Sequence, residues 1–293
     1  MFSQVVAASG ESFPGWSGFL ASRFVTVLRL LRRKKIDMGV NEQAVELANR
    51  IRPVVQVLGG KFMTSPELAE VEAEAGLPPR TLYLRGRSAV LGDVPPKVAA
   101  QLFGIFPHWL FEYTWPAATA ALDAPGAVRA YAESSARWSR VHLLAVSGSA
   151  RLADLLFHVV DAADASGLAL FAGWQAAERP TGDAERLGFA LMLFRELRGG
   201  LHFAALRALG LSVPEAVVAD PEGGRERLLR TAWSPEAADE LVAAAAAKPD
   251  LLDRWHQAER LTDERIGELL AATLSEPERA ELDNLVASLA VPA

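Results

Sequence analysis

The chain has 293 residues, of which 51% are hydrophobic and 23% charged, a mixture that fits one large or two ordinary globular domains. It contains no cysteine, which excludes disulfides, thiolate zinc sites, iron–sulfur clusters and cysteine nucleophiles. The net charge of −6 divides into +4 on residues 1–37 and −10 on the remainder, and so acidic a body should repel nucleic acid unless it carries a local basic patch.

Residues 1–40 form a basic N-terminal extension. Its apolar stretch, residues 19–31, comes before the charges of Arg32-Arg33-Lys34-Lys35, the reverse of the order in a secretory signal. The extension is either a basic amphipathic segment on a membrane surface or, as we expect, a disordered or wrongly assigned start ahead of Met38. No apolar run approaches the roughly 20 residues of a membrane span, and we expect a cytoplasmic protein.

Beyond residue 40, apolar residues recur at three- and four-residue spacing and predict a succession of helices. Alanine is abundant, and it favours helix over strand. Pro53 should kink or restart the first helix. The predicted helices cover residues 41–60, 65–76, 80–91, 98–106, 127–146, 152–165, 168–177, 183–198 and 201–209, and others start after Ser234 and Ser275.

Three helix starts share one chemistry of cap, proline and acid. Ser65-Pro66-Glu67 and Ser234-Pro235-Glu236 are nearly identical, and Ser275 and Glu278 have the spacing of a capping box. The first two indicate either a weak internal duplication of a small helical unit or two independent helix starts.

The most informative segment lies around Arg198. At 100° per residue, Arg198 falls in the middle of an apolar helical stripe, and Arg195 and His202 fall within about 80° of its centre if the helix continues through Gly199-Gly200. A guanidinium in such a stripe needs a carboxylate, backbone carbonyls or a bound anion.

Two interpretations of this segment remain open. In one, Arg195, Arg198 and His202 line a pocket for an anionic or polar ligand, with His202 available for proton transfer. In the other, an internal salt bridge joins two helices. Glu196 faces another side of the helix and could bond a neighbouring helix.

A second candidate region combines Arg87 with an aromatic-rich stretch that contains Phe106, His108 and Trp109. Aromatic rings beside polar groups would suit a planar organic ligand, and the alternative is an aromatic core patch with polar edges. We find no paired-histidine spacing, acidic cluster, glycine-rich nucleotide loop or P-loop, so the sequence predicts no metal site and no cofactor.

The order of several segments resembles an actinobacterial family of helix-turn-helix proteins over residues 44–290. The family pattern includes an R-E-x-R-G-x-x-H segment, matched here by Arg195, Glu196, Arg198, Gly199 and His202, whereas Leu197 and Gly200 stand where the family has a histidine and an aspartate. The other resembling segments are residues 82–92, 103–107, 170–172 and 233–234.

The resemblance implies an α-rich fold with winged-helix-like units, remotely similar to the MarR type. Leu261-Thr262-Asp263-Glu264-Arg265 resembles the segment that follows a wing. A DNA-reading helix needs positive or neutral polar groups. The helices after Ser65 and Ser234 instead begin with several acidic residues, which disfavours DNA.

The sequence therefore predicts an all-α fold, or a mainly α fold with short wing hairpins, as a helical bundle containing winged-helix-like units. Residues 1–40 would be the extension, 41–215 a helical domain with the first unit and the pocket, and 216–293 a second unit.

The leading hypothesis is a protein that binds an anionic or polar small molecule. The alternatives are a ligand-responsive DNA-binding regulator, expected as a homodimer, and an enzyme that acts on an organic metabolite with His202 or Glu196 as acid–base group. The predicted ligand contacts are Arg195, Arg198, His202, Arg87, Phe106 and Trp109.

Overall fold

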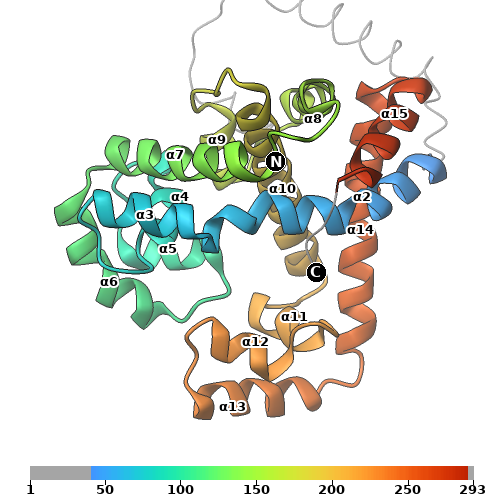
Figure 1. Cartoon of the computed structure of the whole chain (residues 1–293). Helices are drawn as coiled ribbons and strands as arrows, with labels where there is room; N and C mark the ends of the chain where they lie inside the picture. Colours follow the sequence, from blue (N-terminus) through green and yellow to red (C-terminus); the bar gives the residue numbers. More distant parts are fainter. Residues whose placement is uncertain (1–40, 290–293) are drawn as a thin grey trace, which may run out of the picture. The chain divides into compact units, whose positions relative to one another are not determined.

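Helices make up the regular structure of the computed structural model, which describes residues 41–289 (Figure 1). No strand occurs in this range, so the all-α prediction is confirmed and the alternative with wing hairpins is not adopted there. The predicted basic extension, residues 1–40, lies outside the described residues. The α-helices are α2 (Glu42–Lys61), α3 (Pro66–Glu74), α4 (Leu82–Ser88), α5 (Pro96–Phe103), α6 (His108–Ala121), α7 (Ala124–His142), α8 (Ser149–Ala162), α9 (Ala169–Gln175), α10 (Asp183–Ala208), α11 (Val213–Ala219), α12 (Gly224–Arg230), α13 (Pro235–Ala246), α14 (Leu251–Thr273) and α15 (Glu276–Ala287).

The predicted serine caps are present. The Ser65 hydroxyl accepts a hydrogen bond from the Leu68 amide at the start of α3, and Ser234 does the same for Ala237 at the start of α13. Ser275 and Glu278 form the expected capping box of α15. These caps satisfy amide groups that the first turn of a helix leaves without partners, which is why they mark helix starts in the sequence.

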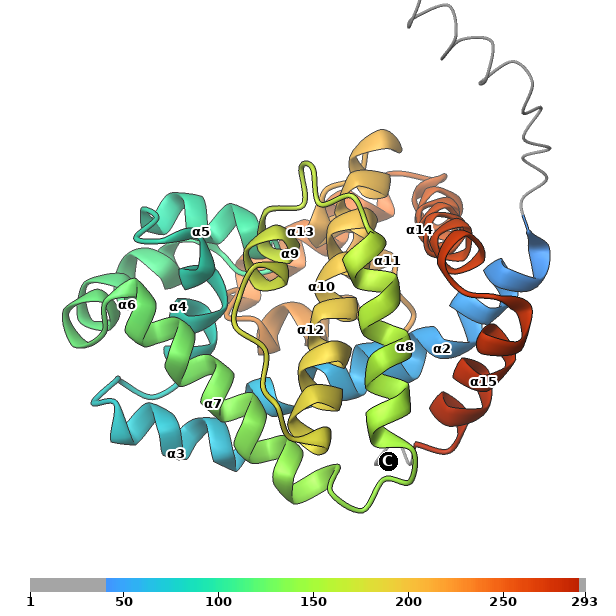
Figure 2. The same ribbon diagram turned by 90° about the horizontal axis from the view of Figure 1, so that it is seen from above.

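The 26-residue helix α10 is the centre of the hydrophobic core. It packs against α2, α7, α8, α9 and α14, and Figure 2 shows it between α7 and α8. Residues 187–194 of α10 are all buried, so this part of the helix has neighbours on every side. An almost uniformly apolar turn of helix is what the centre of a large helical core requires.

Two helices run through positions where the sequence indicated breaks. Pro53 was predicted to kink or restart the first helix; it lies inside a continuous α2, so the helix does not restart there. The helix α10 continues through Gly199-Gly200, and this continuity puts Arg195, Arg198 and His202 on one edge of it. Neither glycine has a positive φ angle.

Two pairs of successive helices follow the two similar serine caps. In the first pair, α3 is followed by a short connection and α4, and in the second pair α13 is followed by a short connection and α14. Residues 261–265, which resemble a segment after a wing, lie inside α14, so no wing precedes them.

The helix α14 contacts helices of both predicted domains, residues 41–215 and residues 216–293. Its first half borders a small cluster of apolar residues from α10, α11 and α13, and its second half packs against α2 and α10. No single described helix is long and apolar enough to span a membrane; α10 and α11 meet that condition only as a pair bent by 95°.

Candidate functional site

Charged side chains gather where α2, α4 and α14 meet α10. We call this group the α10 cluster, and all its members belong to the described part of the chain. Its members are Arg52 of α2, Arg87 of α4, Arg195, Glu196, Arg198 and His202 of α10, and Glu259 and Asp263 of α14.

Arg198 lies inside the molecule, with 5% of its side chain exposed. Its Nη2 is 2.6 Å from Glu259 Oε2 and 3.4 Å from Asp263 Oδ1. Arg52 approaches the same two carboxylates, at 3.0 Å from each. The inward guanidinium that the helical spacing indicated is therefore present, and two acids from α14 are its partners. This salt bridge joins α10 to α14, as the second interpretation of the sequence described.

His202 is one turn further along α10. Its Nδ1 lies 3.1 Å from the Thr262 hydroxyl, which donates its own proton to the Ala258 carbonyl at 2.7 Å. The hydroxyl oxygen therefore accepts from Nδ1, and Nε2 faces Glu259 Oε1 at 3.6 Å. Burial lowers the pKa of His202 below its usual value although Glu259 opposes this, so the ring is neutral at pH 7.

Glu196 forms the other half of the cluster. Its carboxylate is buried and accepts two hydrogen bonds from Arg87, both at 2.8 Å. Burial raises the pKa of Glu196, but the charge and hydrogen bonds of Arg87 outweigh it, and the net shift is downward. An ionised carboxylate held in this way is a poor proton donor, which does not favour Glu196 as a general acid. The catalytic roles of Glu196 and His202 stay predictions.

Arg87 also contacts the aromatic region. Its guanidinium lies over the ring of Phe103 at 4.8 Å from the ring centre and donates to the Tyr83 hydroxyl at 3.1 Å. Phe106 packs against Tyr83 with ring centres 6.0 Å apart, so it is a neighbour of the cluster through Tyr83. Trp109, in contrast, is 53% exposed on α6 and makes none of the polar contacts of the cluster. The structure brings five of the six predicted ligand contacts into one region.

The charges of the α10 cluster do not balance. Four guanidinium groups meet three carboxylates, and His202 is neutral, so one positive charge is left over. The surplus lies with Arg195, because Glu196, its nearest carboxylate, is 3.7 Å away and already bound by Arg87. The Arg195 side chain makes no hydrogen bond to any residue from 41 to 289, and 29% of it is exposed.

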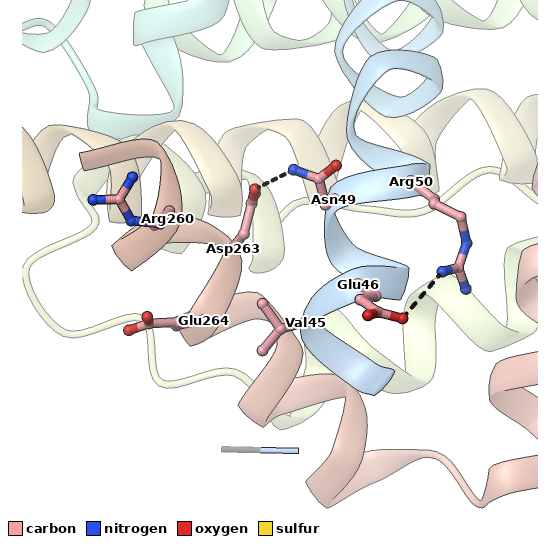
Figure 3. A pocket seen from close by; sticks show the side chains of 7 residues that line it. All are labelled: Val45, Glu46, Asn49, Arg50, Arg260, Asp263 and Glu264. Atoms are coloured by element: carbon pink, nitrogen blue, oxygen red, sulfur yellow. Dashed lines mark hydrogen bonds and ion pairs between the residues drawn. The ribbon is translucent and has the colours of Figure 1, made fainter. Parts of the chain in front are cut away.

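A shallow cavity of about 370 Å³ lies on the far side of Asp263, between α2 and α14. Figure 3 shows Asn49 and Asp263 joined by a hydrogen bond of 3.0 Å, with Glu264 and Arg260 on the same helix as Asp263. Arg198 is not among the lining residues. This cavity therefore reaches the carboxylate of the Arg198 pair and not the guanidinium.

The sequence analysis missed the partners that α2 and α14 supply. Arg52, Glu259 and Asp263 are ordinary charged residues of amphipathic helices, and nothing in their spacing marks them as inward-facing. The one usable signal was Arg198 itself, since a buried arginine requires an acid somewhere in the chain. Within residues 41–289 no group of three or more histidine, aspartate or glutamate side chains is arranged to hold a metal ion.

An all-α chain whose helices pack around the central α10 defines the class of protein. The chain belongs to a helix-turn-helix family, whose model matches residues 44–291. No curated protein and no solved structure matches the chain. The family resemblance inferred from the sequence is confirmed at the level of a helix-turn-helix protein.

Proposed function

We propose that this helix-turn-helix protein binds a small anionic molecule at the α10 cluster, with Arg195 as its anchor. The observation that supports the proposal is the surplus guanidinium. Arg195 lies among buried and half-buried charges, has no carboxylate of its own and is partly exposed. The surrounding protein lowers the local dielectric constant, and this strengthens the attraction between such a charge and a bound counter-ion.

The other predicted contacts take different roles in this proposal. Arg198 and Arg87 hold the carboxylates of Glu259 and Glu196, and so they position the cluster and leave Arg195 without a carboxylate of its own. His202, neutral at pH 7, adds no charge of its own and borders the same helix edge. Phe106 and Tyr83 offer an apolar border next to Arg87.

The proposal is tested by thermal unfolding and calorimetric titration with acetate, benzoate, phosphate and sulfate at constant ionic strength. At least one anion should bind saturably, and at about 100 times its Kd it should stabilise the fold by about 2.7 kcal/mol. Arg195→Gln should abolish this binding, whereas Arg230→Gln, at an exposed position on α12, should leave it unchanged. The absence of saturable binding, or equal binding by Arg195→Gln, would overturn the proposal.

A DNA-binding regulator is the second candidate, and family membership favours it. The two helix pairs differ in the exposed basic and polar side chains that they could offer to DNA. Arg85 and Arg87 of α4 point inward and pair with Asp93 and Glu196, so α4 has no free basic side chain. The first half of α14 is more open, and His256, Gln257 and Arg260 are exposed there. If the protein binds DNA, we expect α14 to make the contacts with the bases.

A further inference from the structure

Exposed apolar side chains concentrate on one helical hairpin, formed by α5 and α6. Val98 of α5 is 45% exposed, and Trp109 and Tyr113 of α6 are 53% and 79% exposed. Single apolar residues at a surface are ordinary, but a contiguous apolar patch marks an interaction site. The two rings, whose apolar area is large, indicate that something covers this hairpin.

The exposed side of α6 is apolar along most of its length. Trp109, Tyr113, Pro116 and Ala120 are all exposed, and at 100° per residue they fall within about 60° of one another. We call these four residues the α6 face. The opposite side of the helix is buried against the aromatic rings around Phe103. A helix that is apolar on both sides is normally covered on both sides, and the described chain covers only one.

Two opposite charges flank the α6 face. Glu112 is the single formally charged residue of α6, and Lys97 stands at the start of α5. Both side chains are exposed, and neither forms an ion pair with any residue from 41 to 289. The hairpin therefore offers a partner one apolar stripe, one negative charge and one positive charge.

The hydrogen bonds of the hairpin fix where Lys97 lies along α6. Trp115 Nε1 donates to the Val94 carbonyl at 2.9 Å. At the other end of the hairpin, Gln101 Nε2 lies 2.8 Å from His108 Nε2. The two helices therefore run antiparallel, and the start of α5 is level with Trp115.

The exposed area is of the size that a small dimer needs. An aromatic side chain buries 150–250 Å², so Trp109 and Tyr113 at their exposed fractions supply about 300 Å² per copy. The smallest specific interfaces bury about 600 Å² per partner, and Val98, Pro116 and Ala120 add to the two rings. Figures 1 and 2 show α6 at the edge of the described helices, where a second copy can approach it.

We propose that the α6 face is the interface of a homodimer, in which two copies of α6 pack antiparallel across a two-fold axis near Tyr113. In this arrangement Glu112 of one copy comes level with Trp115 of the other copy, and so with the start of α5 that carries Lys97. Two Glu112–Lys97 pairs then form across the axis. A parallel arrangement would set Glu112 against its own copy, which like-charge repulsion disfavours.

A membrane surface is the other environment that could cover exposed aromatic rings. Anionic lipid attracts clusters of basic side chains, whereas Lys97 and Glu112 cancel on this hairpin. The charges of the hairpin therefore favour a second copy of the chain.

Sedimentation equilibrium of the full chain at roughly 1 to 200 μM should show a reversible dimer with a micromolar Kd, because an interface near the lower size limit binds weakly. Tyr113→Glu should raise this Kd at least about tenfold, since it places two carboxylates near the axis. The matched control is Leu144→Glu, which makes the same change in charge at a position just after α7 that is 76% exposed, and it should leave the Kd unchanged.

The charge pairs are tested by exchange. Glu112→Lys and Lys97→Glu should each weaken self-association about tenfold, because like charges then meet across the axis. An equimolar mixture of these two variants should associate at least as tightly as the wild type, because both pairs of the mixed dimer again have opposite signs. A role of either residue within its own chain would not produce this rescue.

A chain that stays monomeric over the whole concentration range would overturn the proposal. So would self-association that Tyr113→Glu leaves unchanged, or a mixture of the two charge variants that fails to associate. A monomer that cosediments with phosphatidylcholine–phosphatidylglycerol vesicles, and loses this property in Trp109→Ser, would assign the α6 face to a membrane and overturn the dimer.

Discussion

Inward-pointing arginines are the main structural theme at the residue scale. Arg85, Arg87 and Arg198 are buried or nearly so, and each meets at least one carboxylate from another segment. A buried ion pair gains little net stability over a well-packed apolar pair, but removal of one partner is costly because a charge is left without water or counter-ion. These arginines therefore constrain which helices can be neighbours.

Glu196→Gln tests how much it costs to remove one partner of such an ion pair. The substitution leaves Arg87, whose side chain is 13% exposed, without a carboxylate of its own, and we expect the free energy of unfolding to fall by about 3 kcal/mol. Urea unfolding followed by circular dichroism measures it. The control is Glu74→Gln, which breaks the half-exposed pair with Arg137 and should cost at most about 1 kcal/mol. Equal costs for the two variants would contradict the assignment of Arg87–Glu196 as a buried pair.

At the element scale, close contacts between helices depend on glycines inside them. A Cβ atom added to Gly267 of α14 would lie 2.7 Å from Val45 Cγ2 and 2.8 Å from backbone atoms of the same residue in α2. The two helices can approach so closely only without that side chain. A Cβ atom added to Gly199 of α10 would meet nothing within 4 Å.

Alanine substitutions at these two glycines should therefore change the stability of the protein in opposite directions. Gly267→Ala should destabilise the protein by about 1–3 kcal/mol, since helix backbone must move to make room. Gly199→Ala should stabilise it by up to about 1 kcal/mol, because alanine is the better helix former and has open space there. Urea midpoints of both variants decide the matter. A Gly267→Ala variant as stable as the wild type would contradict the close contact of α14 with Val45, and a destabilised Gly199→Ala variant would contradict the open space at Gly199.

At the scale of the whole molecule, membership of a helix-turn-helix family raises the question of whether the protein binds DNA. The acidic balance of the chain beyond residue 37 and the internal pairing of the arginines of α4 both oppose binding to phosphates. The long α14 has several exposed residues in its first half, and it contacts the α10 cluster near its middle, through Glu259 and Asp263. The helix therefore links Arg198 of the α10 cluster to the exposed side chains at the start of α14.

We expect no binding of the full chain to random-sequence duplex DNA at low salt, measured by fluorescence anisotropy. If the second candidate function is right, binding appears and weakens with salt, and Arg260→Ala lowers the salt slope by about one unit, as loss of a phosphate contact does. Salt-dependent binding that does not respond to Arg260→Ala would place the DNA contact outside the first half of α14.

The sequence by itself determined the local features of this protein. Helical periodicity, alanine content and serine caps act within one or two turns of the chain, so the all-α fold and helix starts such as Ser65, Ser234 and Ser275 were predictable. The position of Arg198 in an apolar stripe was predictable for the same reason. Family membership was also predictable from the order of motifs.

Only the tertiary structure decided what Arg198 meets. Its partners Glu259 and Asp263 are more than 60 residues away on α14, and no local pattern distinguishes them from the other acids of that helix. The surplus charge of Arg195 emerges only when α4, α10 and α14 are packed together. Charge balance and hydrogen-bond satisfaction are properties of a packed neighbourhood, and a linear sequence does not contain them.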